Sequence, residues 1–288
     1  MQVKDTFFRI ILLIAACFAP VLIIGSLLTL SSGFIPAFNE TGLSFFWSAT
    51  WDPQTREFGG VVFLVGTIAT SVLALILSFP FSIAISIFTG EIIHGTRLAS
   101  IIANLVEIIS AIPSVVIGLW AIFVFIPIMQ QLQILIGAIP YGTGFLTATI
   151  VLAFMIIPFS ATLGREVITL VPTHIKEAAY AMGATRFEVI RYVILPYARS
   201  GIIGGFLIST ARAFGETMAV TMLIGNVNHL PTHILSPTNT MASIIANEFA
   251  EATDNVYYAA LIGIGLLLLI SSIVLSYLAR RIIKHFIL

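Results

Sequence analysis

Three ionisable residues lie within long apolar stretches of the sequence, where charged side chains are rare. Arg212 and Glu216 fall near the middle of one stretch, and Glu107 falls in another. A charge at the centre of a bilayer costs roughly 2.5–3.5 kcal/mol on insertion scales, so such a group normally faces a partner charge or a water-filled cavity. These three residues are therefore candidates for a path through a membrane.

The spacing of Arg212 and Glu216 leaves two interpretations open. Because they are four residues apart, they would share one face of a helix and could form an ion pair that only neutralises both charges. Alternatively, the Arg212 guanidinium could line an anion path, since its planar fork binds tetrahedral oxyanions in bidentate geometry. Glu216 would then orient Arg212. Glu107 could face the same path or extend its side chain to the membrane surface.

The sequence offers little else that could perform chemistry. His229 and His233 have the spacing of metal ligands, but Pro231 disfavours a regular helix between them and no third ligand is near. No lysine follows a glycine, so the phosphate-binding Gly-x-x-x-x-Gly-Lys loop of ATPases is absent. We expect no enzyme active site, no metal site and no cofactor bound by this chain.

The elements that must hold these residues are membrane-spanning helices. Hydrophobic residues make up 59% of the 288-residue chain, the mean hydropathy is +1.09, and only 9% of residues are charged, which excludes a soluble globular domain. The 13 basic and 13 acidic residues balance, so no nucleic-acid surface is expected. Six stretches can cross a hydrocarbon core of about 30 Å, and each must be helical, because lipid offers the backbone no other hydrogen-bond partner. They cover residues 8–30, 60–88, 100–127, 144–165, 201–224 and 256–279 within a single membrane domain of residues 1–288.

Basic residues indicate how this all-α bundle crosses the membrane. All but two of the 13 lysines and arginines lie on the side of the N-terminus, either at the two ends of the chain or around the loops after the second and fourth spans. Arg56 lies in a loop on the opposite side, and Arg212 lies within a span. The positive-inside rule therefore predicts that both termini are cytoplasmic. Trp47 and Trp51 suit an aromatic belt at the outer surface.

Residues 172–196 are polar and helix-forming between two apolar spans. Thr173 is a candidate N-cap, alanines follow it, and Gly183 is a natural end for the first helix. Thr185-Arg186-Phe187-Glu188 matches a capping box, and the second helix is expected to run from Arg186 to Leu195 and to stop before Pro196. These signals predict two short helices around Gly183, although a solvated charged loop would also be polar.

Residues 172–196, which we name the coupling segment, resemble the EAA motif of ABC-type importer permeases. It contains Glu177-Ala178-Ala179, Gly183 four residues later, and Val193-Ile194-Leu195-Pro196, where the family usually has isoleucine in place of Val193. The resemblance implies a type I ABC importer permease fold and a segment that docks into a separate ATPase subunit. The residues that it implies for this coupling are Glu177, Ala178, Ala179, Gly183, Arg186 and Glu188.

A longer match points to one branch of these permeases. Arg212-Ala-Phe-Gly-Glu216 through Asn226, together with residues 195–202 and 111–120, resembles the Pst family of phosphate permeases, in particular its PstC-like subunits. The resemblance implies phosphate transport by alternating access, with Arg212, Glu216 and Glu107 along the substrate path, in the bacterial inner membrane. It also implies a homologous PstA-like permease, a PstB-like ATPase dimer that binds ATP and Mg, and a periplasmic or lipid-anchored phosphate-binding protein. The alternatives are a sulfate or molybdate permease and, in a different class, a passive channel or scaffold subunit.

Overall fold

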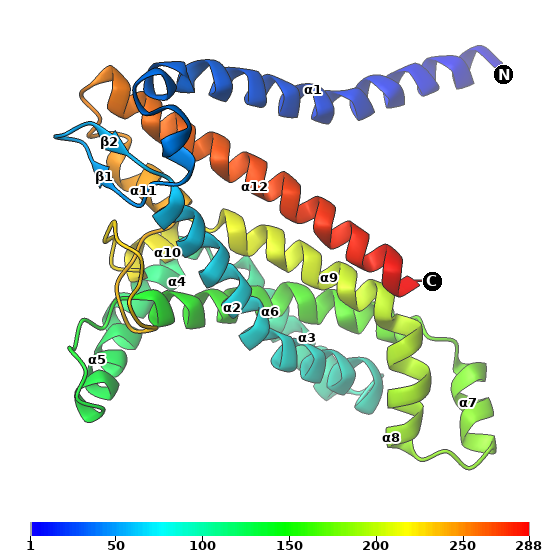
Figure 1. Ribbon diagram of the computed structural model, residues 1–288. Coiled ribbons are helices and arrows are strands. Elements are labelled where there is room, and N and C mark those ends of the chain that lie inside the picture. Colours follow the sequence, from blue (N-terminus) through cyan, green and yellow to red (C-terminus); the bar gives the residue numbers. More distant parts are fainter. Residues whose placement is uncertain (1, 288) are drawn as a thin grey trace.

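The computed structural model describes residues 2–287 and is built almost wholly from helices (Figure 1). A short antiparallel hairpin pairs β1 (Trp51–Asp52) with β2 (Glu57–Phe58). The helices are α1 (Gln2–Thr41), α2 (Val61–Ile87), α3 (Arg97–Ala111), α4 (Ser114–Trp120), α5 (Ile126–Leu135), α6 (Phe145–Thr169), α7 (Thr173–Ala181), α8 (Arg186–Val189), α9 (Leu195–Gly215), α10 (Met218–Leu223), α11 (Met241–Glu248) and α12 (Asn255–Ile287). A 3₁₀ turn, η1 (Gly42–Phe46), and three π-helical segments, η2 (Phe88–Ile92), η3 (Ala121–Phe125) and η4 (Ile190–Ile194), join some of them.

Six helices among the described residues are long and apolar enough to cross a membrane, which agrees with the predicted number. They cover Ile11–Phe46, Val61–Ile92, Ser114–Leu135, Phe145–Thr169, Arg186–Gly215 and Asn255–Leu278. Two of them differ in kind from the predicted spans, because the chain breaks at places that hydropathy does not reveal.

The predicted span over residues 100–127 is wrong as a single helix. Helix α3 ends at Ala111, Ile112 has an extended ψ of 128°, and Pro113 precedes the first residue of α4. A proline disfavours the helical conformation of the residue before it, which explains the break at Ile112. The helix that is long enough to cross the membrane therefore begins after the proline and includes α4, η3 and α5.

The predicted span over residues 201–224 is wrong at both ends. Its helical run begins at Arg186, in α8, and continues through η4 into α9 without stopping before Pro196. Pro196 lies in the first turn of α9 directly after the π-helical segment, so the hydrogen-bond register changes where the proline lacks its N–H. Figure 1 shows α8 turned relative to α9 at this point. At the other end, α9 stops at Gly215 and α10 begins at Met218.

Helices α2 and α6 form the centre of the bundle and are joined by serine hydroxyls. Ser82 Oγ lies 2.6 Å from Ser160 Oγ, and Ser86 Oγ donates to the carbonyl oxygen of Ala161 at 2.9 Å. A Cβ at Gly164 would lie 2.4 Å from Ser86 Oγ, so the two helices approach closely there only because residue 164 has no side chain. These contacts hold α2 and α6 together as one layer.

The two ends of the bundle differ in content. The coupling segment lies toward the same end as the start of α1 and the finish of α12, whereas the hairpin and α11 lie toward the other end (Figure 1). At the hairpin end, Glu248 accepts hydrogen bonds from Trp51 Nε1 at 2.8 Å, Tyr257 Oη at 2.6 Å and Asn228 Nδ2 at 3.1 Å. Trp51 is only 9% exposed and packs in the core, so its predicted place in an aromatic belt is wrong, while Trp47 is 80% exposed.

Candidate functional site

The coupling segment has the two predicted helices, with Gly183 between them. Gly183 has a φ of +89°, and its N–H donates to Tyr180 O at 2.9 Å while that of Ala184 donates to Ala179 O at 3.1 Å. This pair of hydrogen bonds is a Schellman motif, which satisfies the last carbonyl groups of α7. The predicted capping box is also present, since Glu188 N–H donates to Thr185 Oγ1 and Thr185 N–H donates to the Glu188 carboxylate at 2.7 Å.

One predicted detail of the coupling segment is wrong. Pro172, rather than Thr173, occupies the N-cap of α7, and no side chain caps that helix. Proline at the N-cap costs no hydrogen bond, because the first N–H groups of a helix have no partner within it. Thr173 is therefore the first helical residue.

The surface of the coupling segment combines a carboxylate with large exposed apolar side chains. Glu177, Ala178, Gly183 and Glu188 are exposed, and the Glu177 carboxylate has no ion-pair or hydrogen-bond partner among the described residues. Met182 and Phe187 are 83% and 65% exposed. Large apolar groups that remain in contact with water at a membrane protein's polar end are typical of a protein–protein contact.

Two of the predicted coupling residues make contacts within the chain. Ala179 is buried in an apolar cluster under the segment. Arg186 Nη2 donates to the carbonyl oxygens of Ile92 at 2.6 Å and Glu91 at 3.3 Å, at the end of η2. Ala179 therefore positions the segment from beneath, whereas Arg186 is held by these hydrogen bonds and is still exposed, so its part in coupling stays a prediction.

Arg212 lies in the last turn of α9 and is half-buried. Its guanidinium carbon lies 4.4 Å from the centre of the Phe159 ring on α6, which is a cation–π contact. Its Nε is buried and has no hydrogen-bond partner among residues 2–287. The buried Nε is closed to solvent, so only the terminal nitrogens of the guanidinium could meet an oxyanion.

Glu216 does not pair with Arg212, which corrects the prediction of a shared helix face. Helix α9 ends at Gly215, and Glu216 has an extended ψ of 119°, so its side chain leaves the face that carries Arg212. Glu216 Oε1 instead accepts from the N–H of Ala219 at 3.4 Å, at the start of α10. In the part of the chain that the structure describes, no ion pair involves Arg212.

The break after α9 lies beside a second broken helix. Helix α10 packs against α4, where a Cβ at Gly118 would lie 3.1 Å from Ala219 Cα and 2.6 Å from Met222 Sδ. Non-helical backbone at membrane depth is tolerated only where it is buried in protein or lines a water-filled cavity. Discontinuous helices of this kind form the binding sites of many transporters. The break after Gly215 was not found from the sequence, and neither was the contact of Arg212 with Phe159.

Glu107 is not brought to the Arg212 region by any contact of its carboxylate. It lies on the exposed face of α3, and its carboxylate has no hydrogen-bond or ion-pair partner among the described residues. His229 and His233 lie in an irregular loop, and residues 2–287 contain no group of three metal-ligating side chains.

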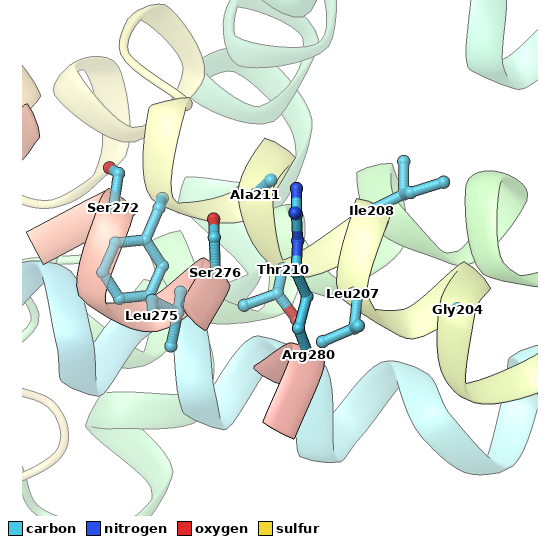
Figure 2. A pocket seen from close by; sticks show the side chains of 10 residues that line it. Gly204, Leu207, Ile208, Thr210, Ala211, Ser272, Leu275, Ser276 and Arg280 are labelled. Carbon is cyan, nitrogen blue, oxygen red and sulfur yellow. The ribbon is translucent and has the colours of Figure 1, made fainter. Parts of the chain in front are cut away.

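A cavity of about 390 Å³ lies between α9 and α12, on a different face of α9 from Arg212. Figure 2 shows Ser272, Ser276 and Arg280 of α12 together with Thr210 and Ala211 of α9. Arg212 is not among the residues that line it. Because Arg212 does not line the cavity, we assign the cavity no part in the site.

Comparisons with known proteins agree with this geometry. Residues 82–284 match the family "Binding-protein-dependent transport system inner membrane component". The chain is 40% identical over 277 residues to a protein of Pasteurella multocida named phosphate transport system permease protein PstC, covering 91% of this chain and 86% of the relative. A protein of Xylella fastidiosa with the same name is 38% identical over 291 residues, covering 96% of this chain and 89% of the relative.

A solved structure shares the fold over the whole length. It is a bacterial ABC transporter involved in the import of the acidic polysaccharide alginate, with a TM-score of 0.65, 15% identity and 99% of each chain covered. This likeness concerns the fold alone. From the family match and the identity to its relatives, the chain belongs to the binding-protein-dependent transport system inner membrane components, the permease subunits of ABC importers, and within them to the PstC-like group.

Proposed function

We propose that this chain is one of the two permease subunits that form the translocation path of an ATP-driven phosphate importer. The observation that carries the proposal is the coupling segment, which two capped helices present with Glu177 and large apolar side chains exposed. The chain lacks a phosphate-binding loop of its own, so the segment needs an ATPase partner. Phosphate is proposed as the substrate because the similar relatives are named phosphate transport system permease proteins.

The partners follow from the same arrangement. The coupling segment docks into a PstB-like ATPase dimer, which binds ATP and Mg, and this chain binds no cofactor. A homologous PstA-like permease forms the other half of the path, and a periplasmic or lipid-anchored phosphate-binding protein delivers phosphate at the hairpin end. The complex lies in the bacterial cytoplasmic membrane, with both termini of this chain and the coupling segment in the cytoplasm, as the distribution of basic residues supports.

Phosphate passes Arg212 at the break between α9 and α10. The contact with Phe159 holds the guanidinium in place and leaves its terminal nitrogens for the anion. Glu216 is held at the start of α10 and so does not neutralise Arg212. Its negative charge near the path limits how tightly the anion binds, which favours release. Closure of the ATPases moves the coupling segments, and the path then opens to the other side of the membrane.

The test is phosphate uptake by the assembled importer in proteoliposomes. Arg212→Gln is expected to lower ATP-dependent uptake by about ten-fold or more, because a charge-assisted hydrogen bond is worth roughly 1.5–3 kcal/mol. Arg212→Lys keeps the charge but loses the guanidinium fork, so its uptake rate is expected to lie between those of the unaltered importer and Arg212→Gln. Glu107→Gln in the same assay tests whether the exposed carboxylate of α3 contributes to the path.

Each alternative has its own outcome. Uptake that survives Arg212→Gln would leave Arg212 only a structural role. If sulfate or molybdate inhibits uptake and unlabelled phosphate does not, the substrate is sulfate or molybdate rather than phosphate. Uptake that is indifferent to ATP depletion, or purification without any nucleotide-binding subunit, would support a passive channel or scaffold.

A further inference from the structure

The coupling segment is fastened to α2 as well as to α9, and this second attachment involves charged groups. Lys176 of α7 lies with its Nζ 2.5 Å from Glu91 Oε2, in the π-helical segment η2 that extends α2. The Lys176 and Glu91 side chains are only 15% and 11% exposed. Arg186, the first residue of α8, donates to two carbonyl oxygens at the end of the same segment.

These contacts use groups that would otherwise lack partners. The last carbonyl groups of a helix accept no hydrogen bond from within that helix. An arginine side chain there can donate to them, and its positive charge interacts favourably with the helix dipole. A nearly buried ion pair holds its geometry more strictly than an exposed one, because separating the charges would leave each desolvated and unpaired. Both helices of the coupling segment are thus bound to one point on α2.

The same point is packed closely against α6. A Cβ at Gly90, next to Glu91, would lie 3.1 Å from Ile168 Cγ2 and 3.2 Å from Arg165 O, so η2 touches the end of α6. Farther along, the serine contacts at Ser82 and Ser86 join α2 to α6. Any displacement of η2 is therefore shared by both helices of the central layer, because packed cores do not deform continuously.

We propose that Glu91, Lys176 and Arg186 form a clamp that transmits movement of the coupling segment to α2. The three are positioning residues, since none of them touches the transported anion. Without the clamp, the coupling segment stays joined to α6 and α9 through the chain, but only the apolar contacts of Ile83 and Ile87 still link it to α2, so α2 follows its movement less closely. ATP hydrolysis then continues while uptake falls. This inference rests on the proposed function, because the clamp transmits movement only if an ATPase docks on the segment.

The experiment measures ATP hydrolysis and phosphate uptake together in the assembled importer in proteoliposomes. Glu91→Gln and Lys176→Met are each expected to lower phosphate transported per ATP hydrolysed by about five-fold or more, the lower end of typical coupling between two sites. The amount of ATPase subunit that copurifies is expected to stay unchanged. Glu166→Gln is the matched control, since this exposed carboxylate lies near the same end of α6 and has no partner among the described residues.

A charge exchange separates transmission from simple loss of stability. In Glu91→Lys with Lys176→Glu, the new glutamate lies near the start of α7 and the new lysine near the end of η2, where the helix dipoles favour them. The adjacent Arg186 repels the new lysine, so recovery is expected to be partial, but the ratio of uptake to hydrolysis should exceed that of either single variant. A double variant that assembles and is no better than the singles overturns the proposal, as does an unchanged ratio in both singles.

Loss of ATPase docking gives a different result from loss of the clamp. Glu177→Gln, on the exposed side of α7, is expected to lower copurified ATPase, hydrolysis and uptake together while the ratio stays constant. If no ATPase copurifies with the unaltered chain, the docking proposal itself fails. A lowered ratio with normal copurification supports the clamp specifically.

Discussion

Gly183 provides a test of why the coupling segment has its shape. Two reasons for a glycine are in competition: the left-handed backbone at the end of α7, and a narrow surface for a partner's groove. The φ of Gly183 is +89°, and a Cβ placed there would meet no atom within 4 Å inside this chain. Within the chain, the cost of replacing it is therefore conformational rather than steric.

The size of the expected effect follows from this conformational cost. A residue with a Cβ pays roughly 1–2 kcal/mol in the left-handed region, whereas asparagine tolerates it better than alanine does. With Gly183→Ala, the equilibrium for opening the Schellman motif is expected to shift by about five- to thirty-fold, since 1.4 kcal/mol is a factor of ten. Gly183→Asn is expected to shift it less, although asparagine is the larger side chain.

Hydrogen exchange read by mass spectrometry measures this directly. The amides of Gly183 and Ala184, which bond to Tyr180 O and Ala179 O, should exchange faster in Gly183→Ala than in Gly183→Asn. ATPase docking should follow the same order in a copurification assay. The reverse order, with asparagine the more damaging of the two, would refute the conformational explanation and show that bulk in the partner's groove decides.

Three further predictions concern the rest of the bundle. Gly66→Ala is expected to lower the free energy of unfolding in detergent by about 1–3 kcal/mol, because its Cβ would lie 2.0 Å from Asn239 O; Gly204→Ala, where a Cβ meets nothing within 4 Å, should change it little. Glu248→Ala should cost about 3 kcal/mol in the same denaturation assay, because three donors at the hairpin end lose their common acceptor; a loss under about 1 kcal/mol would mean that these donors find water instead. Phe159→Leu should lower phosphate uptake by about five- to thirty-fold through loss of a cation–π contact worth ~1–2 kcal/mol, whereas Phe159→Tyr should retain it; equal uptake in both variants would contradict a role for the ring.

The features that the sequence predicted correctly depend on neighbours along the chain. Gly183 ends α7 with a positive φ, and Thr185 and Glu188 form the capping box. Each is a hydrogen bond or a torsional preference within a few residues, so residue types at fixed spacing are sufficient to identify it. The existence of six apolar helices was predictable for a similar reason, because bilayer thickness sets the length of an apolar run.

The features that were missed depend on packing between segments. Apolar residues continue on both sides of Gly215, so hydropathy cannot show that α9 ends there and that Glu216 leaves its helix face. The contact of Arg212 with Phe159 joins residues 53 positions apart, on α9 and α6, which no local pattern encodes. The stop expected before Pro196 was wrong because a π-helical segment absorbs the proline, and such segments have no simple sequence signal.

The helical run from Arg186 to Gly215 explains why the missed break matters. It spans 30 residues, or about 45 Å at 1.5 Å per residue, with the coupling segment at one end and Arg212 in its last turn at the other. Beyond Gly215 the backbone leaves the helix, and α10 packs against α4 instead of continuing α9. In the proposed cycle, α9 therefore moves Arg212 without carrying Glu216 and α10 by the same amount. In that proposal, the broken helix lets the anion path change shape beside Arg212, which an unbroken span over residues 201–224 would not permit.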